Sequence, residues 1–189
     1  MSYISKLIIS KGAYPIVMVS SLVLYQTALN AGCHLVTATY LPVIVAALIV
    51  LLLELIHPER KEWKPTVSEF RLDALYMLLV QVLLPKLLTF LVVWALLGSV
   101  QELQFDIWPS HLPALYQVAL MLVAVEFFRY WLHRAAHEWG PLWRLHAIHH
   151  SPKGLYWLNV GRFHPLEKTL QFVIDLLPFM LLGVDETII

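Results

Sequence analysis

The sequence predicts an all-α integral membrane protein, a polytopic helix bundle with a histidine-rich helical cap. Hydrophobic residues make up 59% of the chain and charged residues only 14%, with a mean hydropathy of +0.70, whereas soluble domains are about a quarter charged. Several apolar runs reach the length of about 20 residues that a membrane span requires. Six of the nine histidines lie between Tyr130 and Glu167. The formal net charge of zero gives no indication of a nucleic-acid partner.

Four apolar segments are long enough to span a membrane: residues 14–31, 35–56, 72–98 and 112–132. The third is interrupted by Pro85, which removes a backbone donor, so we expect a kink there. The adjacent Lys86 is expected to lie against other helices or near an aqueous cavity. A fifth segment, residues 170–184, contains Asp175 and Pro178. It is short for a span and is expected to be partial, re-entrant or interfacial.

Basic residues alternate between the two ends of these spans. Lysines precede the first span, and residues 57–71 hold four basic residues, whereas residues 30–34 and 99–111 hold none. Five more lysines and arginines follow the fourth span. The positive-inside rule therefore places the N-terminus and every histidine in the 133–164 region in the cytoplasm. Chance alternation over a few short loops is the alternative.

The histidines have the spacing of a metal site. His133 and His137 are four residues apart and share a face of a helix. His146, His149 and His150 are related by three and four residues and also share a face. Imidazole is the commonest metal ligand in proteins. For each histidine alone, a position on the surface or at the membrane interface is the better explanation, but five in two boxes predict rings that face one metal cluster.

The residue types around the boxes narrow the choice of metal. Arg134 follows His133, where zinc proteases of the His-Glu-x-x-His type carry their glutamate. Cys33, the single cysteine, lies far from the boxes, so a thiolate-rich structural zinc site is unsupported and an internal disulfide is excluded. An imidazole-rich site suits iron, copper, zinc or nickel.

The pattern His-x-x-x-His followed by His-x-x-His-His resembles the fatty acid hydroxylase superfamily, which includes sterol desaturases and sterol C4-methyl oxidases. The resemblance covers residues 126–170, with the phrases Tyr-Trp-Leu-His-Arg, Leu-Trp-Arg-Leu-His, His-His-Ser and His-Pro-Leu-Glu. It implies a histidine-ligated non-haem di-iron centre that activates O2 and attacks a lipid C–H bond. The metal-binding candidates that it implies are His133, His137, His146, His149, His150 and, in the His-Pro-Leu-Glu phrase, His164.

One departure from the family concerns a third histidine box, which the family carries further downstream. This sequence has no histidine after His164 and stops at Ile189. We therefore expect the chain to be the front part of a longer protein, unable to assemble the full centre and inactive in isolation. On this interpretation, residues 1–111 contribute three spans. Residues 112–189 form a truncated fatty acid hydroxylase-like catalytic region.

Glu126 is the candidate catalytic residue, because it lies on the same helical stripe as His133 and His137. An ionisable group inside a span usually faces the bundle interior. There it could accept a hydrogen bond from the second nitrogen of a ligand imidazole. An ion pair with Arg129 or Lys86 is the alternative. Weaker candidates for the same role are Glu138, Asn159 and Glu167; the last could instead pair with Arg162 or Lys168.

The sequence thus predicts a membrane-bound oxidoreductase that hydroxylates or desaturates a lipid of sterol or fatty acyl type. The resemblance implies O2 as the oxidant and a separate reductase as the electron donor. Two other functions stay open. One is a zinc-binding membrane protein with a hydrolytic or structural role, and the other is a catalytically silent membrane scaffold.

Overall fold

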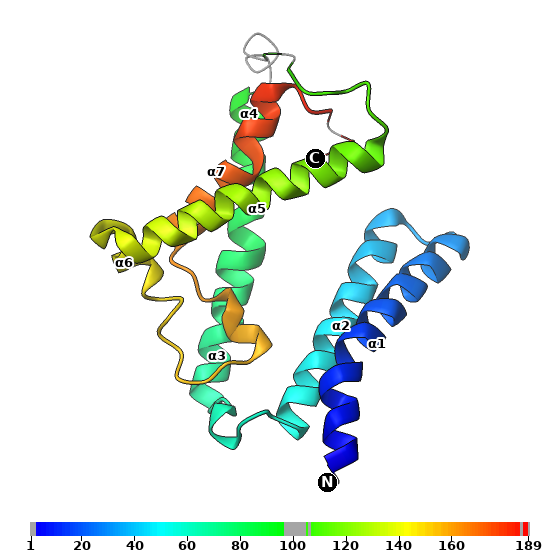
Figure 1. Ribbon diagram of the computed structural model, residues 1–189, viewed down its shortest axis with the longest axis vertical. Coiled ribbons are helices and arrows are strands. Elements are labelled where there is room, and N and C mark those ends of the chain that lie inside the picture. Colours follow the sequence, from blue (N-terminus) through cyan, green and yellow to red (C-terminus); the bar gives the residue numbers. More distant parts are fainter. Residues whose placement is uncertain (1–2, 97–104, 106, 186, 189) are drawn as a thin grey trace. The chain divides into compact units, whose positions relative to one another are not determined.

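The computed structural model describes residues 3–96, 105, 107–185 and 187–188 of the 189-residue chain (Figure 1). Every regular element in these ranges is helical, which confirms the all-α prediction. The chain divides into two compact units, Met1–Lys64 and Pro65–Ile189. The sequence placed a boundary between the N-terminal spans and the catalytic region at residue 111, on the basis of the histidine boxes. That functional boundary stays a prediction.

The first unit is a helical hairpin of α1 (Tyr3–Asn30) and α2 (Leu35–Ile56). Gly32 makes the turn with a φ of 74°, a left-handed conformation that glycine adopts without strain. The side chain of His34 caps α2 by accepting from the backbone N–H of Val36. Small residues such as Ala38, which is fully buried, let the two helices pack closely.

Four helical segments are long and apolar enough to cross a membrane: Lys11–Asn30, Leu35–Ile56, Val67–Val92 and Ala114–Glu138. They correspond to the four spans expected from the sequence, whose existence is confirmed by length and composition. Most of their large apolar side chains face outward, as expected for helices that pack against lipid. The chain is therefore a membrane protein. The fifth apolar segment lies in α7 (Pro165–Leu182), which is not among these four.

The third span contains a π-helical turn in front of its proline. It comprises α3 (Val67–Tyr76), η2 (Met77–Leu83) and α4 (Leu84–Leu96). Pro85 cannot donate to the preceding turn, and the backbone N–H of Leu84 bonds to Leu79 O, five residues back. The interruption expected at the proline thus takes the form of a widened helical turn. Lys86 is exposed rather than buried against other helices.

In the second unit, α5 (Ala114–Glu138) packs along α7, which also contacts α4 and α6 (Gly140–His146) (Figure 1). The short helix η3 (Trp157–Gly161) packs against α3 and η2. A small apolar core of Val125, Phe179 and Val184 joins α5 to the end of α7. This arrangement brings the end of α5, α6 and the start of α7 together.

A buried charged network ties α3 to the segment that follows the second histidine box. Asp73 is fully buried, and Tyr156 and Arg162 are 7% and 8% exposed. The Tyr156 hydroxyl donates to Asp73 Oδ2 at 2.5 Å, and Arg162 Nε donates to Asp73 Oδ1. Burial raises the pKa of the Tyr156 phenol, and the hydrogen bond to Asp73 raises the pKa of Arg162. The network anchors residues 151–163 to the third span.

Replacing Asp73 by leucine should therefore strongly destabilise the fold, because it leaves the Arg162 guanidinium buried without its counter-charge. Removing one partner of such a pair costs about 3–5 kcal/mol. Thermal unfolding of the purified protein in detergent measures the loss. The double variant Asp73→Leu/Arg162→Met should recover most of it, since no charge is left unpaired. Equal unfolding of the wild type and Asp73→Leu would show that the network contributes nothing.

Candidate metal centre

The last turns of α5 present the first histidine box. His133 and His137 lie one helical turn apart, with their Nε2 atoms 3.1 Å from each other. The second box comes from the end of α6 and the turn after it, where the Nε2 atoms of His146 and His150 are also 3.1 Å apart. His150 joins the two boxes, because its Nε2 lies 3.2 Å from that of His137.

The four ligand atoms all lie within 4.8 Å of one another. Nitrogens about 2.1 Å from one ion are separated by about 3.0 Å at right angles and by about 3.4 Å in a tetrahedron. The three Nε2 separations of 3.1–3.2 Å fall inside this range. Four imidazoles that point their lone pairs at one another repel unless a proton or a cation lies between them. The donor set and these three separations therefore suit the binding of a metal ion.

Burial keeps His146 of the second box in its metal-binding state. His146 is fully buried, and burial, together with the neighbouring His150 and His137, lowers its pKa to about 4. At neutral pH its imidazole is therefore uncharged and its lone pair is available to a metal. The ring of Trp143 stacks on that of His150, with centroids 5.7 Å apart, and covers one side of the cluster.

Glu167, in the first turn of α7, orients the buried histidine. Its Oε1 lies 2.6 Å from His146 Nδ1, and both side chains are buried. The Nδ1–H donates to the carboxylate, so the Nε2 lone pair of His146 points into the cluster. Burial raises the pKa of Glu167. The sequence ranked this residue as a weaker candidate and suggested Arg162 or Lys168 as its partner, whereas the structure pairs it with His146.

Two further histidines predicted to bind metal lie outside the group of four. The His149 ring stacks on Phe163 with centroids 4.4 Å apart, and its centroid is 5.3 Å from those of His146 and His150. His164 caps α7, where its Nδ1 accepts from the N–H of Leu166 at 3.1 Å. Metal binding by these two residues stays a prediction.

The structure places Glu126 in the ion pair that was the alternative interpretation. Its carboxylate lies 3.5 Å from the Arg129 guanidinium, and its side chain is 71% exposed. Arg129 in turn makes two hydrogen bonds to Asp175, of 2.8 and 2.6 Å. The carboxylate that contacts a box histidine is therefore Glu167, not Glu126. A catalytic role for Glu126 stays a prediction, and the residue does line a pocket beside His133.

The sequence also contains three isolated histidines near span ends, His34, His57 and His111, which we expect to lie away from the centre; for the two in the first unit this stays a prediction. His34 and His57 flank α2 in the first unit. His111 lies just before α5, whose other end carries the first box. Sequence reasoning missed Asp73, although an acidic residue inside a predicted span is itself a signal of a buried partner. It also missed the partner of Glu167, because nothing local in the sequence relates α6 to α7.

The fold and the site together define a membrane protein whose helices hold a four-histidine cluster able to bind metal. Residues 118–189 match the sequence model of the family described as fatty acid hydroxylase. A similar protein is ornithine lipid hydroxylase OlsE of Rhizobium tropici, 45% identical over 76 residues, which are 40% of this chain and 23% of that protein. No solved structure matches the chain. The resemblance to fatty acid hydroxylases is thereby confirmed for the histidine-rich region.

Substitutions of Glu167 and of Glu126 should change the metal affinity by different amounts. Glu167→Gln should weaken metal binding by about tenfold or more, because it removes the charge that orients and polarises His146. Glu126→Gln, the matched control on α5, should leave affinity within about twofold, since Glu126 pairs with Arg129. Competition with a chromophoric chelator measures both affinities. If Glu126→Gln gave the larger loss, our assignment of the orienting carboxylate would be wrong.

Proposed function

We propose that the protein is a membrane-bound lipid hydroxylase that uses non-haem iron and O2. The observation that carries the proposal is the convergence of four imidazole Nε2 atoms from α5, from the end of α6 and from the turn after it, with Glu167 behind one of them. The likeness of residues 118–189 to fatty acid hydroxylases supports the reaction type. The name of the similar protein favours hydroxylation over desaturation, and a lipid with an amino-acid headgroup as the substrate.

The residues of the site have separate roles in this proposal. His133, His137, His146 and His150 hold the ion, and Glu167 keeps the His146 lone pair directed at it. Iron bound there supplies the oxygen chemistry, the activation of O2 for insertion into a C–H bond. His149 and His164 are proposed as additional donors for a second iron, as the family resemblance implies. Trp143 stacks on His150 and supports that ring from one side.

The surroundings of the site fit a substrate that arrives from the bilayer and electrons that arrive from the cytoplasm. The site lies at the end of α5, a helix of membrane-spanning length. Basic residues gather in the segments after it, which favours a cytoplasmic location by the positive-inside rule. A separate reductase is the proposed electron donor.

Metal content and turnover test the function in the protein as its gene encodes it, including any residues that follow Ile189. We expect about two equivalents of iron, as the di-iron resemblance implies, and O2-dependent hydroxylation of a lipid in the presence of reductant. His133→Ala should abolish turnover, because it removes a metal donor, whereas His111→Ala should not. Zinc with no iron would instead support the zinc-binding alternative. A protein loaded with iron that oxidises no lipid would support the silent scaffold.

Labelling of introduced cysteines tests the orientation in a background where Cys33 is replaced by serine. Ser151→Cys should react with reagent applied from the cytoplasmic side, because it directly follows the second box. Gln104→Cys, at a position outside the described residues, should react only from the opposite side. The reverse pattern would contradict a cytoplasmic site.

A further inference from the structure

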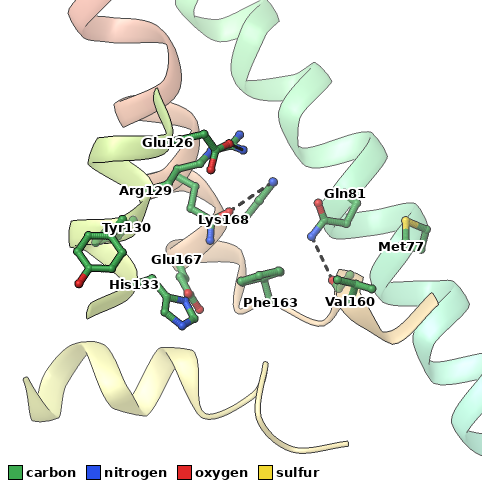
Figure 2. A pocket seen from close by; sticks show the side chains of 13 residues that line it. Met77, Gln81, Glu126, Arg129, Tyr130, His133, Val160, Phe163, Glu167 and Lys168 are labelled. Atoms are coloured by element: carbon green, nitrogen blue, oxygen red, sulfur yellow. Dashed lines mark hydrogen bonds and ion pairs between the residues drawn. The ribbon is translucent and has the colours of Figure 1, made fainter. Parts of the chain in front are cut away.

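A pocket of about 610 Å³ opens beside His133, between α5, η2, η3 and α7 (Figure 2). Its lining contains both apolar and charged side chains. Apolar side chains in the lining are Met77, Leu132, Val160 and Phe163, of which Met77 and Val160 lie on the side of Gln81 (Figure 2). Charged side chains in the lining are Glu126, Arg129, Glu167 and Lys168. A pocket of this kind suits an amphipathic ligand, because a purely apolar one would strip water from the charged groups without replacing their hydrogen bonds.

Among the described residues that line the pocket, Lys168 makes no hydrogen bond to a carboxylate, although Asp175 and Glu167 attract it at longer range. Among the described contacts, its Nζ donates to Gln171 Oε1 at 3.5 Å and to no acidic side chain. Figure 2 shows its side chain directed into the pocket, toward the helix that carries Gln81. Burial lowers the pKa of Lys168. An ammonium in this setting is stabilised when an anion binds beside it.

Arg129, the other cation of the pocket, is already neutralised. Its guanidinium is held by Asp175 through two hydrogen bonds, of 2.8 and 2.6 Å. Glu126 reaches the same guanidinium only at 3.5 Å and is 71% exposed. The Arg129–Asp175 pair therefore leaves Glu126 with its negative charge incompletely compensated. Apart from Glu167, the pocket residues thus offer one positive group and one negative group to a ligand.

A buried acceptor close to the histidines completes the lining. Glu167 is 4% exposed, and its Oε2 has no hydrogen-bond partner among the described residues. The other oxygen of this carboxylate holds His146. The charged side chains of the lining therefore include both Glu126 and Glu167, which orients the proposed metal ligand. A headgroup bound beside them lies next to the proposed reaction centre.

We propose that this pocket binds a lipid headgroup that carries both an anion and an ammonium, with Lys168 facing the anion and Glu126 the ammonium. The apolar side chains of the lining then contact the start of the acyl chain. This inference rests on the proposed function for its substrate class, but it makes a separate claim about recognition. A carboxylate in an amino-acid lipid and a phosphate in a phospholipid are two sources of the same anion chemistry.

Direct binding tests the proposal without turnover. The probes are an N-acylornithine, its methyl ester, which lacks the carboxylate, and an N-acylnorvaline, which lacks the ammonium. Calorimetric titration into the purified protein in detergent gives each affinity. Lys168→Met should weaken binding of N-acylornithine by about tenfold or more, the effect of losing a charged hydrogen bond. It should not change binding of the methyl ester.

Glu126→Gln should show the complementary pattern, with weaker binding of N-acylornithine and unchanged binding of N-acylnorvaline. Lys168→Arg should keep most of the affinity, and Lys153→Met is the control for a lysine outside the pocket. A zwitterionic phosphatidylethanolamine that binds more tightly than N-acylornithine, with the same dependence on Lys168, would support the charge pair and identify phosphate as the anion.

Equal binding of all probes to the wild type and to Lys168→Met would overturn the inference. That result leaves the proposed function standing if iron and turnover are still present. Conversely, charge-selective binding in a protein that never oxidises a lipid would support the pocket and contradict the hydroxylase. The two failures are therefore distinguishable.

Discussion

The hydrogen bond between His146 and Glu167 is the interaction on which the site depends. It joins the end of α6 to the first turn of α7, 21 residues later in the chain, in a fully buried setting. Because Nδ1 is committed to the carboxylate, Nε2 of the same ring has to face the cluster. The carboxylate also lies in the first turn of its helix, where the helix dipole favours negative charge. One contact thus sets both the tautomer and the direction of a metal donor.

The segment between the second box and α7 is held in place by residues of the third span. Asp73 anchors it through Tyr156 and Arg162. Gly161 lets it approach the π-helical turn, because an added Cβ would lie 3.0 Å from Met77 Cε and 3.2 Å from Gln81 Cγ. Met77 and Gln81 also line the pocket beside His133, so the third span contributes to the site although it carries no box histidine.

The sequence predicted those parts of the structure that depend on residues close together in the chain. The four spans follow from apolar length, and the convergence of His133 with His137 follows from helical spacing. The choice between Glu126 and Glu167 did not follow, because both are near the boxes in sequence and only the packing of α7 against α6 decides between them. The widened turn before Pro85 was foreseen only as a kink, since a proline removes a donor but does not dictate how the helix accommodates the loss.

The central claim is that imidazoles from both boxes hold one metal ion. X-ray absorption spectroscopy of the protein loaded with a single equivalent of metal tests this claim most directly. The account predicts multiple scattering from about four imidazole rings, with nitrogens at about 2.0–2.2 Å from the ion. A first shell dominated by oxygen, with one imidazole or none, would contradict it, because the four histidines would then be neighbours that share no ion.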